Sequence, residues 1–265
     1  MRLNRLIVSL LTLALIGCTA SQTATQASDR PDGSHGCDAF EQCEDGSGTE
    51  NGTSDGTPAG TDTAPEERAA FKTAYESLNG TQNKSEKVYR TVTVPEDHPF
   101  KEISVTDAVS ALKNGESFYL YVGDPKCPWC RAVLETACAK AKEYGIQEIR
   151  TLTIWDAEGN EILRDKYRLE DGKPVKVSEG AEGYADLLDA FDSLLDEYEL
   201  TNDAKEKIAV GEKRIYAPTY FRIDKGTAVR ATGGYGSSMT DPWADLTEEM
   251  LKEEQSEFDG LFGEQ

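Results

Sequence analysis

The sequence predicts one α/β domain, a sandwich of helices around a mixed sheet, within an acidic chain of 265 residues. Two observations lead to this fold class. Segments of strand-like composition alternate with segments of helical periodicity after residue 67, and a hairpin followed by a helix ends the series. Hydrophobic residues make up 38% of the chain, below the roughly 45–50% usual for globular proteins, so part of the chain is expected outside any core.

The domain is expected to open with two helices and two strands. Residues 68–78 could form a helix, and residues 88–94 have the composition of a strand. Ser104 is typical of a helix N-cap, the apolar residues after it have helical spacing, and Gly115 is expected to end that helix. The apolar and aromatic residues 118–122 predict a buried strand.

Further helices and strands follow in alternation. They are a helix at residues 128–144, a strand at 149–155, an amphipathic helix at 181–198, a hairpin of strands 220–223 and 227–231, and a last helix from after Asp245 to about Phe258. Residues 156–180 do not fit this alternation. We interpret them as an insertion that could form an extra hairpin or a short helix.

The first seventeen residues have the pattern of an export signal. Arg2 and Arg5 precede eleven mostly apolar residues, a stretch too short to span about 30 Å of hydrocarbon. The four residues that end in Cys18 resemble a bacterial lipobox, in which that cysteine is lipidated and becomes the new N-terminus. The alternative is an ordinary secretory signal followed by a cysteine by chance. Lipidation would anchor the protein to a bacterial membrane outside the cytoplasm, where disulfides persist.

Residues 18–66 are predicted to be a disordered tether ahead of a domain at 67–265. The segment is rich in Ser, Thr, Gly and Asp, and cannot bury enough apolar surface to offset the entropy lost on ordering. Cys37 and Cys43 lie within it. A small local disulfide loop, a metal site that also uses His35, and an extra redox pair are all compatible with their spacing.

Charge and composition disfavour several classes of function. The formal net charge of -21 argues against nucleic acid as a partner, because phosphate binding needs clustered Lys and Arg. The chain has two histidines, His35 and His98, and neither lies in a catalytic motif. A His-based hydrolase and a His-rich metal site are therefore disfavoured, which leaves cysteine as the residue type that could carry chemistry.

The motif Cys127-Pro128-Trp129-Cys130 lies where the strand at 118–122 gives way to a helix. Cys127 is expected at or beside the N-cap, where free N–H groups and the helix macrodipole favour a thiolate. Pro128 suits the first helical turn. Lys126 either lowers the thiol pKa further or is a solvated surface charge. Because the thiolate is the nucleophile, this environment predicts a reactive cysteine.

The helical phase assigns different roles to the two sulfurs. Cys130 lies three residues after Cys127, on the stripe that faces the core, whereas Cys127 is expected at the exposed tip of the helix. We expect Cys127 to attack a substrate disulfide and Cys130 to resolve the mixed disulfide that forms. Cys138 follows on the same stripe and is interpreted as a small buried hydrophobic residue, with a regulatory thiol as the alternative.

This part of the chain resembles the thioredoxin-like superfamily. The residues that carry the resemblance are the strand at 118–122, Cys127-Pro128-Trp129-Cys130 with its helix, Ala217-Pro218-Thr219-Tyr220-Phe221 before the hairpin, and Gly233-Gly234 after it. The resemblance covers about residues 88–258 and implies a three-layer sandwich with a mixed sheet. It also implies a cis peptide bond at Pro218, packed beside the two cysteines.

The same resemblance implies where a substrate would bind. Ala217 would offer backbone hydrogen bonds to an extended substrate, with Thr219 beside it. Trp129 is interpreted either as a platform for the substrate or as a partly exposed ring. The run from Tyr119 to Gly123 ahead of the motif is also similar to the exported thioredoxin-like proteins called bacteriocin transport accessory proteins.

Two positions depart from the family pattern. Lys126 stands where the family often has Trp, and Tyr121 stands six residues before Cys127, where thioredoxins carry a buried acid. The proton acceptor for the inner thiol is therefore missing or supplied by another residue.

The sequence thus predicts an extracytoplasmic, membrane-tethered thiol–disulfide oxidoreductase that acts on protein or peptide disulfides with an unknown redox partner. It needs no cofactor or metal, because the electrons reside on the sulfur pair. The rival interpretation is an accessory or binding lipoprotein that presents a client peptide or toxin, with the cysteines as a structural staple. Zinc is disfavoured for want of four ligands, and a thiol peroxidase because such sites do not rely on a CxxC pair.

Overall fold

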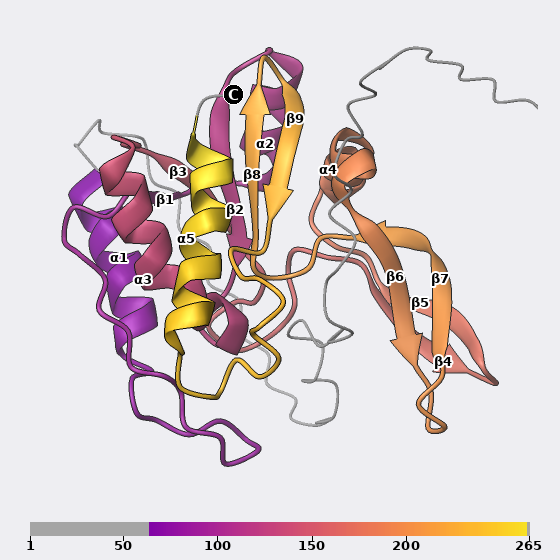
Figure 1. Cartoon of the computed structure of the whole chain (residues 1–265). Coiled ribbons are helices and arrows are strands. Elements are labelled where there is room, and N and C mark those ends of the chain that lie inside the picture. The colour runs from indigo at the N-terminus through magenta and orange to yellow at the C-terminus, as the bar shows by residue number, and fades with distance from the viewer. Residues whose placement is uncertain (1–63, 264–265) are drawn as a thin grey trace, which may run out of the picture.

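The computed structural model describes residues 64–263, which form an α/β fold with a five-stranded mixed sheet flanked by helices (Figure 1). The export signal, Cys18, the tail cysteines Cys37 and Cys43, and His35 lie outside the described residues. Within residues 64–263, no helix is both long and apolar enough to cross a bilayer.

The sheet contains two kinds of strand pairing. Its order is β1 (Phe100–Glu102), β3 (Ile149–Thr153), β2 (Phe118–Gly123), β8 (Thr219–Asp224) and β9 (Thr227–Thr232). β1, β3 and β2 run parallel, whereas β8 pairs antiparallel with both β2 and β9. The strands predicted at 118–122, 149–155, 220–223 and 227–231 are therefore confirmed. The central strand β2 is buried from Leu120 to Gly123, as its apolar composition predicts.

The helices cover both faces of the sheet. They are α1 (Ala64–Glu76), α2 (Val105–Lys113), α3 (Pro128–Glu143), α4 (Tyr184–Phe191), the short 3₁₀ helix η1 (Asp192–Leu194) and α5 (Glu248–Phe262). Figure 1 shows α1, α3 and α5 grouped on one side, with α2 and α4 on the other. The predicted N-cap of α2 is confirmed, because the Ser104 side chain accepts the N–H of Asp107.

The strand predicted at residues 88–94 is absent from the sheet, and that prediction is wrong. Tyr89 donates its N–H to the backbone carbonyl of Thr81, whereas the N–H groups of residues 92–94 bond to side chains. Val92 donates to Asn79, Thr93 to Glu135 and Val94 to Glu76. These side chains supply the hydrogen bonds that a β-ladder would otherwise provide, so the β-rich composition leads to an extended strap rather than a strand.

The helix predicted at residues 181–198 is shorter than its apolar pattern indicates. Tyr184, Leu187 and Phe191 do share its buried face, but the chain becomes extended at Leu195. Tyr198 lies instead on β6 (Asp196–Thr201), which pairs antiparallel with β7 (Lys207–Arg214) in a hairpin that the sequence did not predict. The apolar residues of α4 and of β6 happen to continue one helical spacing, and this spacing led to the prediction of a single long amphipathic helix.

The insertion at residues 156–180 contains a hairpin, one of the two alternatives predicted for it. Its strands are β4 (Lys166–Glu170) and β5 (Lys173–Ser178). This hairpin contacts the β6–β7 hairpin, and together they project from the main sheet as a hairpin arm (Figure 1). In the chain the two hairpins of the arm lie between β3 and β8, and α4 separates them. The end of the arm is therefore close in sequence to Ala217 and Pro218, which directly precede β8.

Candidate functional site

Cys127 forms the N-cap of α3, as predicted. Its sulfur accepts the backbone N–H of Cys130 at 3.4 Å, and Pro128 occupies the first helical turn. The N–H of Cys127 in turn donates to the carbonyl of Asp124 at 3.1 Å, which closes the loop between β2 and the helix. Free N–H groups and the positive end of the helix dipole favour a negatively charged sulfur at this position.

Among the described cysteines, Cys130 and Cys138 are free thiols and Cys127 is disulfide-bonded. Cys138 is buried, which agrees with its interpretation as a small hydrophobic residue.

The expected exposure of Cys127 is also wrong, because its side chain is 0% exposed. The carbonyl oxygen of Ala217 lies 3.6 Å from the sulfur and covers one side of it.

Cys130 lies one helical turn inward and is fully buried, as its helical phase predicts. Burial raises the pKa of its thiol to about 12. A hydrogen bond from the Tyr121 side chain and one from the backbone of Asp124 act in the opposite direction. The sulfur of Cys130 is therefore a protonated thiol. Once it loses its proton, the same two hydrogen bonds would stabilise the thiolate.

A pair of buried tyrosines lies behind Cys130. The hydroxyls of Tyr121 and Tyr75 are 2.7 Å apart, and the ring of Tyr121 stacks on Tyr220 at 4.5 Å. Burial raises the pKa of all three hydroxyls well above the usual value. Tyr121 thus occupies the position six residues before Cys127 as a neutral hydrogen-bond donor rather than as an acid.

Asp124 is a site residue that the sequence analysis missed. Its carboxylate is buried and accepts the backbone N–H groups of Lys126 at 2.8 Å and Trp155 at 3.3 Å. Burial raises the pKa of this carboxyl to about 6, and its negative charge raises the pKa of Cys130. An acid directly after the apolar strand, three residues before Cys127, was the signal that could have revealed it.

Arg131, directly after the motif, is a second residue that was missed. Its guanidinium is buried and donates to the carbonyls of Tyr75 and Pro125, at 2.9 Å and 3.2 Å, and to Arg90. It therefore joins α1 and the segment before α2 to the loop that leads into Cys127.

The segment before β8 meets the cysteine across 90 residues of sequence. The peptide bond between Ala217 and Pro218 is cis, as expected, and both residues are buried. Thr219 donates through its hydroxyl to the carbonyl of Tyr216 at 2.6 Å, which fixes the turn into β8. The structure therefore brings Ala217, Pro218 and Cys127 together at one site.

Trp129 and Lys126 occupy different environments at this site. The ring of Trp129 is 5% exposed and packs against Tyr235, with ring centroids 4.7 Å apart, so it is not the partly exposed ring of one interpretation. Lys126 is partly exposed. The described residues contain no group of three or more His, Cys, Asp and Glu side chains that could hold a metal ion.

The insertion contributes Arg164 to the surroundings of the site. Its side chain is fully buried, its guanidinium lies 5.4 Å from the ring of Trp155, and it donates to the carbonyl of Ile215 at 3.4 Å. Its charge lowers the pKa values of Asp124 and Cys130. The positive charge of this insertion residue therefore acts on Asp124 and Cys130.

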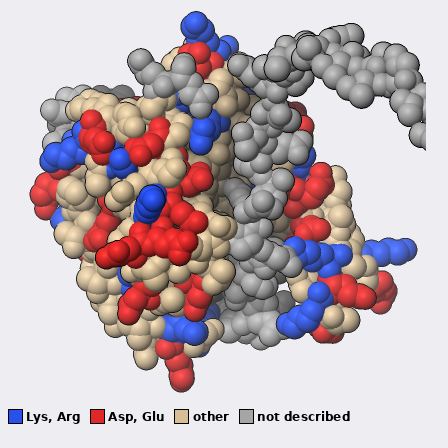
Figure 2. Space-filling model, in the orientation of Figure 1, with Lys and Arg blue, Asp and Glu red and all other residues tan. Residues whose placement is uncertain are grey.

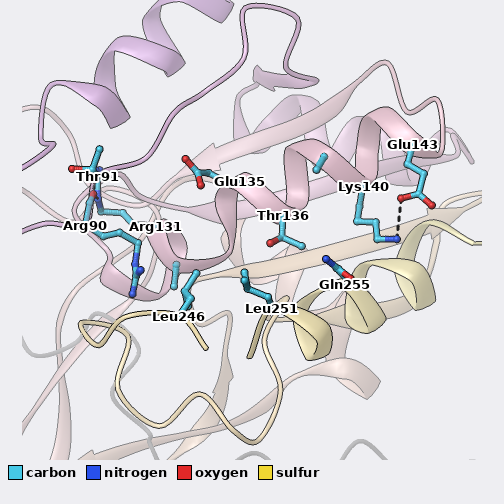
Figure 3. Close-up of a pocket in the computed structure, with 12 residues that line it drawn as sticks. Arg90, Thr91, Arg131, Glu135, Thr136, Lys140, Glu143, Leu246, Leu251 and Gln255 are labelled. Atoms are coloured by element: carbon cyan, nitrogen blue, oxygen red, sulfur yellow. Dashed lines mark hydrogen bonds and ion pairs between the residues drawn. The ribbon is translucent and has the colours of Figure 1, made fainter. Parts of the chain in front are cut away.

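A cavity of about 440 Å³ lies elsewhere, beside α3 and α5 (Figure 3). Neither cysteine of the motif lines it. Its Lys140 is paired with Glu143 and with Asp259, at 2.9 Å and 2.6 Å. No cysteine among residues 64–263 lines this cavity, so these residues cannot carry out thiol–disulfide chemistry there.

Comparison with known proteins adds no family to these observations. No protein-family model matches the chain, and no curated protein matches it significantly.

Proposed function

We propose that this chain is a thiol–disulfide oxidoreductase of thioredoxin-like fold that acts on protein disulfides through Cys127 and Cys130. One observation carries the proposal. The sulfur of Cys127 caps a helix and accepts the N–H of Cys130, and it lies against Ala217, next to the cis bond at Pro218. A second, free sulfur follows one turn inward.

The arrangement of the sheet supports the proposed three-layer, thioredoxin-like sandwich. Three parallel strands in the order β1-β3-β2 continue into the antiparallel pair β8 and β9, with helices on both faces. The cysteine motif follows the central strand, and Pro218 immediately precedes the strand beside it. In the superfamily that the sequence resembles, a cis-proline packs beside the cysteine pair in the same way.

The proposed reaction consists of two thiol–disulfide exchanges. The thiolate of Cys127 attacks one sulfur of a substrate disulfide, a mixed disulfide forms, and the other substrate sulfur leaves as a thiolate. Cys130 then loses its proton and attacks the sulfur of Cys127, which releases the second substrate thiolate. Two electrons pass to the substrate and a Cys127–Cys130 disulfide remains. The reverse sequence oxidises a dithiol, and the reduction potential of the pair sets the direction.

Asp124 is the residue best placed to accept the proton of Cys130. With a pKa of about 6 its carboxyl is ionised at neutral pH, whereas the thiol, with a pKa of about 12, is protonated. The backbone of Asp124 hydrogen-bonds to that thiol, and Tyr121 donates a hydrogen bond to the same sulfur. Asp124 thus takes the role of proton acceptor. Position 121, where thioredoxins carry a buried acid, is a tyrosine in this chain.

We further propose that the chain works outside the cytoplasm, anchored to a bacterial membrane through lipidated Cys18. The basic start, the apolar stretch and the lipobox support this location. The partners would be protein or peptide thiols and disulfides together with a redox partner, and no cofactor is required. Acidic side chains gathered over the face formed by α5 (Figure 2) support a protein partner rather than nucleic acid.

The complete burial of Cys127 favours a second candidate, an accessory or binding lipoprotein that presents a client peptide or toxin. The two functions differ in whether the inner thiol resolves a disulfide on Cys127. A Cys130→Ser variant accumulates mixed disulfides with thiol-containing proteins if the chain is an oxidoreductase, and none if it is a binding protein.

Activity is tested by insulin reduction and by refolding of reduced ribonuclease, after the chain itself has been reduced. The wild type is expected to be active in at least one assay, and Cys127→Ser inactive in both. Cys138→Ser is the matched control, because it removes another buried free thiol of α3 outside the motif. Equal rates for the wild type and Cys127→Ser would exclude the oxidoreductase.

A further inference from the structure

The buried guanidinium of Arg164 lies between the two segments that enclose Cys127. On one side it faces the ring of Trp155, whose backbone N–H donates to the Asp124 carboxylate. The carbonyl of Asp124 in turn accepts the N–H of Cys127. Two contacts therefore connect Arg164 to the loop that presents the nucleophilic sulfur.

On its other side, Arg164 holds the segment that leads to the cis-proline. It donates to the carbonyl of Ile215 at 3.4 Å, two residues before Ala217. Ala217 is the residue whose carbonyl oxygen lies 3.6 Å from the sulfur of Cys127. A single side chain from the insertion thus contacts Trp155, which bonds to Asp124, and Ile215, which lies two residues before Ala217.

The neighbouring Arg214 differs from Arg164 in the direction of its contacts. Both arginines pair with Glu161, and both are buried. Arg214, however, donates to the carbonyl of Asp165 at 2.9 Å and lies over the ring of Tyr198, 4.1 Å from its centroid, within the hairpin arm. It therefore provides a matched comparison that loses the same kind of buried charge away from the cysteines.

We propose that Arg164 is a positioning residue of the cysteine pair, which fixes the loop at Asp124 against the segment at Ala217. The assignment rests on the proposed oxidoreductase function. It gives the insertion a definite role, since the segment that carries Arg164 also carries the hairpin arm. The charge of Arg164 thereby links the hairpin arm to the loss of the proton of Cys130.

Several titratable groups act on this site. Asp124 and Cys130 are influenced by Lys126, Arg131, Arg164, Tyr75, Tyr89, Tyr121 and Tyr220. Among these, Arg164 lowers the pKa of both Asp124 and Cys130. Loss of its charge should therefore raise the pH at which Cys130 attacks.

The test uses the full chain with its other four cysteines, Cys18, Cys37, Cys43 and Cys138, replaced by Ser. The reduced protein is mixed with 5,5′-dithiobis(2-nitrobenzoate). Attack by Cys127 releases one nitrothiobenzoate, and attack by Cys130 on the resulting mixed disulfide releases the second. The rate of the second release is measured against pH in the parent chain, Arg164→Gln, Arg164→Lys and Arg214→Gln.

Arg164→Gln is expected to move the midpoint of the pH profile upward by roughly half a pH unit, the effect of losing one nearby, partly compensated charge. Arg164→Lys keeps the charge and should restore the midpoint. Arg214→Gln should lower thermal stability and move the midpoint much less than Arg164→Gln does, because its one effect on Arg164 is to leave their shared partner Glu161 with a single arginine. If Arg164→Gln does not fold, Glu161→Gln takes its place and should move the midpoint downward, because it leaves Arg164 less compensated.

Two contrary results are distinguishable. A parent chain that releases one nitrothiobenzoate instead of two would overturn the oxidoreductase and the role of Arg164 together. A parent that releases two, with the same midpoint in Arg164→Gln and Arg214→Gln, would overturn the role of Arg164 alone. An unchanged midpoint in Glu161→Gln would overturn it in the same way.

Discussion

Cys127 is held by the loop before it, by the helix after it and by a segment 90 residues further along the chain. It accepts an N–H from Cys130 in α3, follows the loop at Asp124, and lies against Ala217. Each contact is made by a main-chain group, so the position of the sulfur depends on backbone geometry more than on any one neighbouring side chain.

Reduction of the Cys127 disulfide should make this cysteine reactive. We expect iodoacetamide to leave Cys127 unmodified before reduction and to modify it after mild reduction, since only a free thiol reacts. Cys138 should react far more slowly, because burial raises the pKa of its thiol to about 12. Mass spectrometry of the peptides measures both rates. Equal rates for the two reduced cysteines would contradict the proposed activation of Cys127.

Removal of the Asp124 carboxylate should slow the second exchange step. Asparagine cannot accept the proton of Cys130, and a positioned general base typically contributes 10²–10⁴-fold, so a loss of about 100-fold is expected for Asp124→Asn at pH 7. Because the pKa of the carboxyl is about 6, the wild-type rate should rise as pH increases through that value. A variant with the wild-type rate and pH profile would show that another group takes the proton.

At the scale of elements, α3 and α5 share a buried carboxyl. Glu254 of α5 is fully buried and accepts the hydroxyl of Thr136 of α3, and burial raises its pKa from 4.5 to about 7. The folded state therefore binds this proton more tightly than the unfolded state. The resulting stability is fully present below pH 4.5 and is lost as pH rises through about 7.

Glu254→Gln should remove this pH dependence, because glutamine keeps an acceptor for Thr136 and carries no charge. The variant and the wild type should be equally stable at pH 4.5, and the variant more stable at pH 8. Between pH 4.5 and 7 the difference should grow by at most ~1.4 kcal/mol per pH unit. Urea unfolding across this range measures it. A constant difference would mean that Glu254 does not titrate in this window.

The N-cap of α2 should contribute measurably to stability. Ser104→Ala removes the acceptor for the N–H of Asp107 and should cost about 1 kcal/mol of unfolding free energy. Ser110→Ala is the matched control, since that exposed hydroxyl only donates to the Thr106 carbonyl inside the same helix. Equal losses in the two variants, measured by urea unfolding, would assign the effect to something other than capping.

At the scale of the whole molecule, local signals predicted most of the central sheet and the position of Cys127. Turn glycines, caps and a continuous apolar strand act over a few residues, so the sequence exposes them directly. The failures have longer-range causes. Residues 92–94 satisfy their N–H groups with distant side chains, and Cys127 is covered by Ala217, 90 residues further along the chain. Arg164 became recognisable only once the fold had placed it against Trp155 and Ile215.

The extended strap at residues 92–94 has a consequence for how the molecule opens. Val92 and Val94 donate their N–H groups to Asn79 and Glu76, in the turn after α1 and at its end, whereas Thr93 donates to Glu135 of α3. The strap is therefore bonded to both helices, and separation of α1 from α3 must break one of the two sets of bonds. Deuterium uptake at Thr93 should report release of the strap from α3, and uptake at Val92 and Val94 its release from α1.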